Sequence, residues 1–158
     1  MPATEVLIVT AFVATMGTAT FYEPEDVGKN GARVSIGQTQ GYVKEQTLSA
    51  GIEHNKWEAN YTVQGNRNEE TAEGNTRMYS ITRVIRPAWG TPEVQPVFKI
   101  GPAYVTNSPF VGRENMHLAF GLEVYDKLSL TWDHYSSGGV SRPNSGIENL
   151  KLTYLIEW

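Results

Sequence analysis

The chain has 158 residues, of which 40% are hydrophobic and 19% charged, and its net charge at neutral pH is −4. This length and balance fit one folded domain with a sizeable core and exclude an intrinsically disordered chain. There is no cysteine, the three histidines are far apart, and no basic stripe is present. The sequence therefore excludes a disulfide framework, offers no metal-binding motif, and gives no sign of nucleic-acid binding.

The N-terminal segment contains one apolar run, from Val6 to Met16, followed by the small residues Gly17-Thr18-Ala19. The run is shorter than the roughly 20 residues of a membrane-spanning helix. It resembles the hydrophobic region of a signal peptide with a small-x-small cleavage site, although Glu5 and the lack of Lys or Arg before it are atypical. An uncleaved strand or arm is the alternative. We therefore expect residues 1–30 to be a signal segment or an N-terminal arm, and residues 31–158 to form a single domain.

Beyond residue 30, helical periodicity is nearly absent and apolar residues recur at every second position, which predicts an all-β domain. Eight strands are expected, at about 32–43, 46–54, 56–64, 76–87, 94–106, 115–125, 127–136 and 147–158. Short connections alternate with longer polar ones, and only the first connection departs from this rule. Short turns at one end and long loops at the other are typical of a transmembrane antiparallel barrel with periplasmic termini.

The last three expected strands show the alternation most clearly. Each is about 10–11 residues long, enough to cross a bilayer at a tilt. Their odd positions include Glu123, Asp133, Lys151 and Glu157, whereas the even positions are mostly apolar, and the chain ends on Trp158. These patterns predict an eight-stranded antiparallel up-and-down barrel of the outer-membrane type, with a polar interior. The alternative is a soluble eight-stranded barrel of the lipocalin type, which would bury the apolar side chains.

Three residues with catalytic chemistry fall on the apolar side of this barrel. His134 and Ser136 are two positions apart, so in a strand they point to the same face. Glu148 has the same parity in the next strand, and a register that pairs it with His134 also pairs Trp132 with Leu150. Directly opposed Cβ atoms lie roughly 4.5–5.5 Å apart. The pattern therefore predicts a His–Glu contact beside a serine hydroxyl on the lipid-facing wall.

This arrangement suits nucleophilic ester hydrolysis. Ser136 would be the nucleophile, His134 its general base, and Glu148 the acid that orients the imidazole and stabilises its charged form. Candidate oxyanion donors are the backbone amides of 137–139, which include Gly138 and Gly139, and the Asn144 side chain. His-x-Ser alone is a weak motif, and a polar rim at a strand end is the alternative interpretation. By the same parity, Asp133 and His117 face the lumen, so neither is expected in the site.

A resemblance supports the catalytic interpretation. From about residue 116 to residue 158 the sequence is similar to the lipid A 3-O-deacylase (PagL-type) family of outer-membrane barrels. The matching features are the strand ending in Trp132-Asp133-His134-Tyr135-Ser136, the Gly138-Gly139 turn, the segment Pro143-Asn144-Ser145-Gly146-Ile147-Glu148, and the aromatic C-terminal strand. The family often has Asn directly after the nucleophile, where this chain has Ser137, which bears on the oxyanion assignment rather than on the triad.

The resemblance implies an eight-stranded barrel with its site on the outer wall. It assigns the catalytic roles to His134, Ser136 and Glu148 and places Asn144 near the oxyanion. It implies a serine carboxylic-ester hydrolase that removes an acyl chain from lipid A, with lipopolysaccharide as its partner, no cofactor and an outer-membrane location. The alternative is a non-enzymatic structural barrel, for example a component of a virion or another assembled particle. The sequence leaves the acyl chain and the oligomeric state open.

Overall fold

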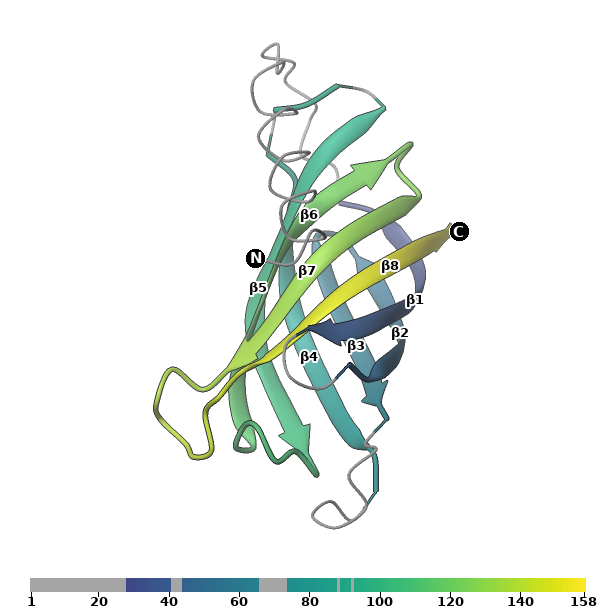
Figure 1. Ribbon diagram of the computed structural model, residues 1–158. Coiled ribbons are helices and arrows are strands. Elements are labelled where there is room, and N and C mark those ends of the chain that lie inside the picture. Colours follow the sequence, from purple (N-terminus) through teal and green to yellow (C-terminus); the bar gives the residue numbers. More distant parts are fainter. Residues whose placement is uncertain (1–27, 41–43, 66–73, 88, 92) are drawn as a thin grey trace.

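The protein is a closed barrel of eight antiparallel strands, in which each strand pairs with its neighbours in sequence and β1 closes against β8 (Figure 1). The computed structural model describes residues 28–40, 44–65, 74–87, 89–91 and 93–158, so the expected signal segment or arm lies almost entirely outside the described residues. The strands are β1 (Asn30–Gln40), β2 (Gln46–His54), β3 (Trp57–Gln64), β4 (Thr76–Ile85), β5 (Val94–Thr106), β6 (Glu114–Val124), β7 (Leu128–Ser136) and β8 (Ile147–Glu157). The predicted fold is confirmed, with strand ends within about two residues of those expected, apart from the end of β1.

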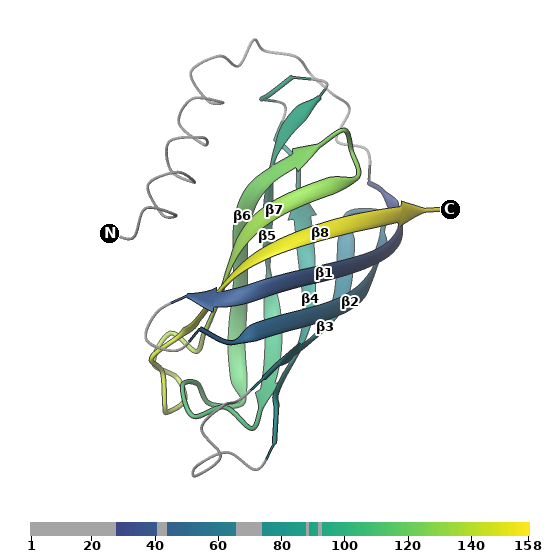
Figure 2. The ribbon, with the colours of Figure 1, turned by 45° about the vertical axis from the view of Figure 1, so that its right-hand side comes forward.

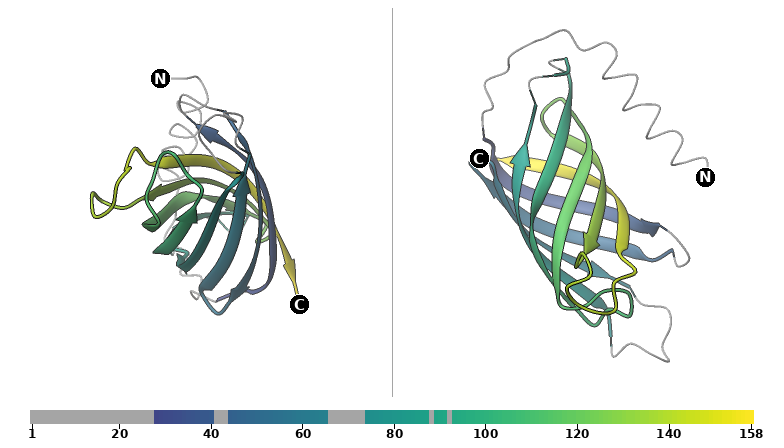
Figure 3. Two further views of the ribbon diagram at one scale, coloured as in Figure 1. Left: turned by 90° about the horizontal axis from the view of Figure 1, so that it is seen from below. Right: turned by 90° about the vertical axis from the view of Figure 1, so that its left-hand side faces the viewer.

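The two ends of the barrel differ as the connection lengths predict. The β5–β6 and β7–β8 loops project from one end, here called the long-loop end, and the C-terminus lies at the other (Figure 1). Figure 3 shows from below how the strands surround a common axis. At the C-terminal end, Asn55-Lys56 and Tyr125-Asp126 make tight turns in which each of the four residues has a positive φ. Two consecutive positive φ values are the geometry of the two-residue hairpin turn that matches strand twist.

The outer wall is apolar. Leu118, Leu130 and Leu152 all point outward and are 42%, 42% and 41% exposed. Because a soluble barrel would bury them, the lipocalin-type alternative is wrong and the membrane interpretation holds. In the part of the chain that the structure describes, no helix has the length and hydropathy to cross a membrane.

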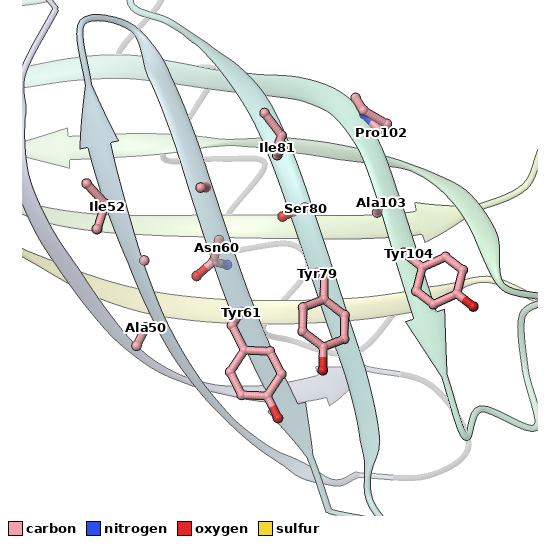
Figure 4. Close-up of a pocket in the computed structure, with 12 residues that line it drawn as sticks. Ala50, Ile52, Asn60, Tyr61, Tyr79, Ser80, Ile81, Pro102, Ala103 and Tyr104 are labelled. Carbon is pink, nitrogen blue, oxygen red and sulfur yellow. The ribbon is translucent and has the colours of Figure 1, made fainter.

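Aromatic side chains lie on this wall near the long-loop end. Tyr61, Tyr79 and Tyr104 are register partners on β3, β4 and β5, and their hydroxyls all point the same way (Figure 4). They border an apolar hollow that includes Ile81 and Pro102. Amphipathic rings at one level are typical of the zone where a bilayer meets water.

Buried charged side chains in the interior form ion pairs with one another. Arg86 bridges Glu53 at 2.7 Å and Glu123 at 3.0 Å, and Lys99 binds Glu58 at 2.7 Å. A buried charge without a partner would cost several kcal/mol, so these pairs are what allows a polar lumen. Toward the long-loop end the interior changes to a small apolar cluster, which sequence parity alone does not reveal. Its members are Met78, Ala103, Val105, Val111, Tyr135 and Ile147.

Candidate active site

The three expected catalytic residues lie together on the outer wall, where β7 ends and β8 begins. The β7–β8 register places His134 opposite Glu148 and Trp132 opposite Leu150, as the sequence predicts. Ser136 is the last residue of β7, two positions beyond His134 and on the same face. Figure 2 shows β7 and β8 side by side, with their connecting loop at the long-loop end.

The imidazole of His134 faces the carboxylate of Glu148. Its Nδ1 lies 3.8 Å from Glu148 Oε1, with the two side chains 25% and 43% exposed. This separation allows an ion pair but exceeds a hydrogen bond. Nδ1 is buried, and it has no hydrogen-bond partner among the described residues. A small rotation of the Glu148 side chain would supply the partner that this nitrogen lacks.

The His134 ring is held between two neighbours. The Trp132 ring stacks on it with centroids 5.5 Å apart and an angle of 13° between the planes. Gly146 also packs against the ring, because a Cβ at this position would lie 3.1 Å from His134 Cε1. Gly146 also has φ = +80°, a conformation that favours glycine. Gly146, twelve positions along the chain from His134, therefore helps to restrict the rotation of the imidazole.

In the β7–β8 loop, one of the expected oxyanion donors, the Ser137 amide, already has a hydrogen-bond partner. The Ser137 amide donates a 2.8 Å hydrogen bond to Asn144 Oδ1, so this amide is already occupied. The same bond fixes the Asn144 carboxamide and leaves its Nδ2 as the donor. Gly138 and Gly139 are exposed with φ of +60° and +89°, and neither amide has a hydrogen-bond partner within the described ranges. The candidate donors are thus reduced to Asn144 Nδ2 and the two glycine amides.

A contact that the sequence did not suggest holds this loop in place. Asn144 forms an isolated β-bridge with Val111 of the β5–β6 loop. On either side of it, Gly112 N donates to Pro143 O at 2.7 Å and Ser145 N donates to Phe110 O at 2.8 Å. The Pro-Asn segment is therefore a short strand partner of the neighbouring loop. The β5–β6 segment carries no motif by which sequence reasoning could have found this contact.

The other histidine and acid of this region lie inside the barrel, as parity predicts. His117 is fully buried and bonds Ser80 Oγ at 3.1 Å and Asp133 Oδ2 at 2.9 Å. Asp133 also binds Lys151 at 3.0 Å. This inner group is separated by the barrel wall from His134, so it is not part of the outer site. Within the described residues no group of three His, Asp or Glu side chains could hold a metal ion.

Comparison with known proteins gives several matches. The crystal structure of the outer membrane enzyme PagL superposes with a TM-score of 0.55 and 19% identity over 80% of this chain and 99% of that one. The N-terminal β-barrel domain of Pseudomonas aeruginosa OprF gives 0.53 and 15% over 82% and 99%. Neisserial surface protein A gives 0.52 and 14% over 83% and 97%. At these low sequence identities, the structural similarity shows that the fold is shared.

A search of curated protein sequences finds no match. The family model described as lipid A 3-O-deacylase (PagL) matches residues 31–157. This range includes every strand except the first residue of β1, and it contains the whole outer site. The chain therefore belongs to the lipid A 3-O-deacylase (PagL) family.

Proposed function

We propose that the protein is a serine esterase that removes the 3-O-linked acyl chain from lipid A, with Ser136 as nucleophile, His134 as general base and Glu148 as the orienting acid. The observation that carries this proposal is the position of the three residues on one patch of the outer wall. There the imidazole faces a carboxylate at 3.8 Å. Membership of the deacylase family supports the choice of substrate.

The depth of the patch fits a lipid substrate. The protein is an outer-membrane barrel, and in such barrels the long loops face the cell exterior. His134 lies two residues from the long-loop end of β7, and Glu148 one residue from that end of β8. Below them the wall is apolar, with Leu130 and Leu152 exposed. An ester near the sugars of an outer-leaflet glycolipid would therefore meet the patch, while its acyl chains lie along the wall.

The reaction follows from the roles of the three side chains. A neutral imidazole carries one proton, and pairing of Nδ1–H with Glu148 leaves Nε2 as the base. Nε2 takes the hydroxyl proton as Ser136 Oγ attacks the ester carbonyl, and the tetrahedral intermediate carries the negative charge on the former carbonyl oxygen. Collapse breaks the ester C–O bond, and the imidazolium returns its proton to the departing sugar oxygen.

Water completes the cycle. It attacks the acyl-serine while His134 accepts its proton, and the fatty acid leaves as Ser136 Oγ is reprotonated. Each intermediate needs donors aimed at its oxyanion. Asn144 supports this role because its oxygen is anchored to the Ser137 amide at 2.8 Å, which fixes the direction of its Nδ2.

The test is lipid A mass spectrometry of cells that express the protein or its variants. Ser136→Ala and His134→Asn should abolish loss of the acyl chain while the folded barrel keeps its heat-modifiable mobility on gels. Ser145→Ala is the matched control, since this exposed serine contributes only its backbone amide to the loop contact. Deacylation by either site variant at the wild-type rate would refute the mechanism. Absence of deacylation by the wild type would instead favour a non-enzymatic barrel.

A further inference from the structure

At the long-loop end of the barrel, polar side chains on the outer wall reach farther along the strands on β7 and β1 than on the other strands. At the long-loop end, most of them occupy the first or last residue of a strand, as Gln40, Gln46, Thr106, Glu114 and Ser136 do. Gln38 and His134 are different, because each lies two residues inside its strand. A carboxamide facing lipid costs free energy unless it has a hydrogen-bonding partner. A binding role would explain why Gln38 faces lipid, as a catalytic role explains why His134 does.

The register places this glutamine beside the proposed active site. Strands β7, β8, β1 and β2 follow one another across the barrel (Figure 2). Side chains of the outer wall form three rows across them: His134, Glu148 and Gln40; then Trp132, Leu150, Gln38 and Gln46; then Leu130, Leu152, Ile36 and Leu48. The first row contains catalytic candidates, the second joins Trp132 to two glutamines, and the third is aliphatic. The polar patch therefore extends from the site across β8 onto β1 and β2.

A cation lies at the far end of the first row. The hydrogen bond from Thr39 N to Glu45 O, 2.8 Å long, continues the β1–β2 register, and the next step places Lys44 across from Gln40. Lys44 is exposed, and it forms no ion pair with any residue that the structure describes. Three strand spacings separate it from His134, which is about 14 Å. A phosphorylated disaccharide head group can cover that span.

These residues border one groove on the wall. Its polar lining includes Gln38, Gln46 and Lys44, and its apolar lining includes Ile36, Leu48 and Leu152. Leu150 and Leu130 continue the lining toward β7. Amides and a cation next to an aliphatic row match an amphiphile whose head group is anionic and rich in hydroxyl and amide groups. Charge complementarity and continuity with the catalytic row both point to the same lipid that the site would cleave.

We infer that the outer face of β1 and β2 is the head-group subsite of the enzyme. In this subsite Lys44 pairs with a phosphate of lipid A, and the side chains of Gln38 and Gln46 hydrogen-bond to its sugar or acyl-amide groups. An acyl chain that is retained lies over Ile36, Leu48 and Leu152. The inference rests on the proposed function, since it orients the substrate so that its ester reaches Ser136. It assigns substrate binding to two strands that carry no catalytic residue.

The experiment measures binding separately from turnover. Ser136→Ala protein in detergent micelles is titrated with lipid A, and binding is followed by intrinsic tryptophan fluorescence, to which Trp132 beside Leu150 in the second row contributes. Adding Lys44→Ala should weaken binding about fivefold, and Lys44→Glu about thirtyfold, as expected for loss and reversal of one solvated charge pair. Both effects should vanish with dephosphorylated lipid A. Lys127→Ala, at the opposite end of the barrel, is the matched control.

Gln38→Leu tests the amide contacts. Leucine suits a lipid-facing wall, so the barrel should remain as stable as before, while binding weakens about fivefold through one lost hydrogen bond. In protein that retains Ser136, the same substitutions should raise KM for lipid A and change kcat less than twofold. Binding unchanged in Lys44→Glu, or weakened equally for dephosphorylated lipid A, would overturn the subsite. A wild type that binds lipid A in this manner but never cleaves it would overturn the proposed function alone.

Discussion

Replacement of Glu148 by Gln tests the least constrained member of the proposed triad. The change keeps the shape of the side chain but removes the charge that faces His134. The energy at stake follows from the separation of 3.8 Å between Nδ1 and Oε1. For unit charges at that distance, Coulomb's law gives about 1 kcal/mol in water and about 4 kcal/mol at the effective dielectric constant of a protein surface.

These energies correspond to a loss in kcat/KM of about sixfold to about a thousandfold. Because Glu148 is 43% exposed, solvent screens part of its field, and we expect a loss of about 10–100-fold. The assay follows fatty acid released from lipid A in detergent micelles. Glu114→Gln is the control, because this exposed acid begins β6 on the same wall and at the same end. A Glu148→Gln enzyme within twofold of wild type, or an equal loss in Glu114→Gln, would show that the acid does not orient His134.

Three further predictions address the surroundings of the site. Asn144→Asp keeps an oxygen that can hold the loop but removes the Nδ2 donor. The value of kcat should therefore fall about 10²–10³-fold while KM changes little, and an unchanged kcat would show that Asn144 is not an oxyanion donor. Gly146→Ala forces a Cβ to 3.1 Å from the His134 ring, and it should lower kcat at least tenfold without unfolding the barrel, as checked by gel mobility. Asp133→Asn leaves Lys151 without its acid at 3.0 Å, and it should reduce the free energy of unfolding in urea by about 3–5 kcal/mol; unchanged stability would contradict the role of this inner pair.

The fold was predictable because one sequence signal fixes it. Alternation at period two specifies which side of each strand meets lipid, and a slip of one residue would bury the whole apolar set. The same parity correctly assigned His134 to the outer wall and His117 to the interior, and the pairing of His134 with Glu148 followed from it. Local patterns therefore sufficed where the contact joined strands that follow one another in the sequence.

Contacts between distant segments were not predictable in this way. Alternation does not show that Asn144 would bridge Val111, since loops follow no periodic rule. Nor does it show that the Ser137 amide would donate to the Asn144 side chain and so be removed from the candidate oxyanion donors. The subsite on β1 and β2 was missed for a different reason. It adjoins the site only because the barrel closes β1 against β8, which joins the two ends of the domain.

The alternation also separates the physical requirements of stability from those of catalysis. Along β7, Asp133 and Tyr135 are buried in the interior network, whereas His134 and Ser136 face the membrane boundary. Stabilising charge pairs thus lie on one side of a single strand and the candidate catalytic groups on the other. Asp133 and Tyr135 both bind Lys151 in the interior, whereas the buried Nδ1 of His134 on the outer face has no hydrogen-bond partner among the described residues. In the mechanism that we propose, a rotation of Glu148 would satisfy this unmet hydrogen bond as the imidazole takes up the proton of Ser136.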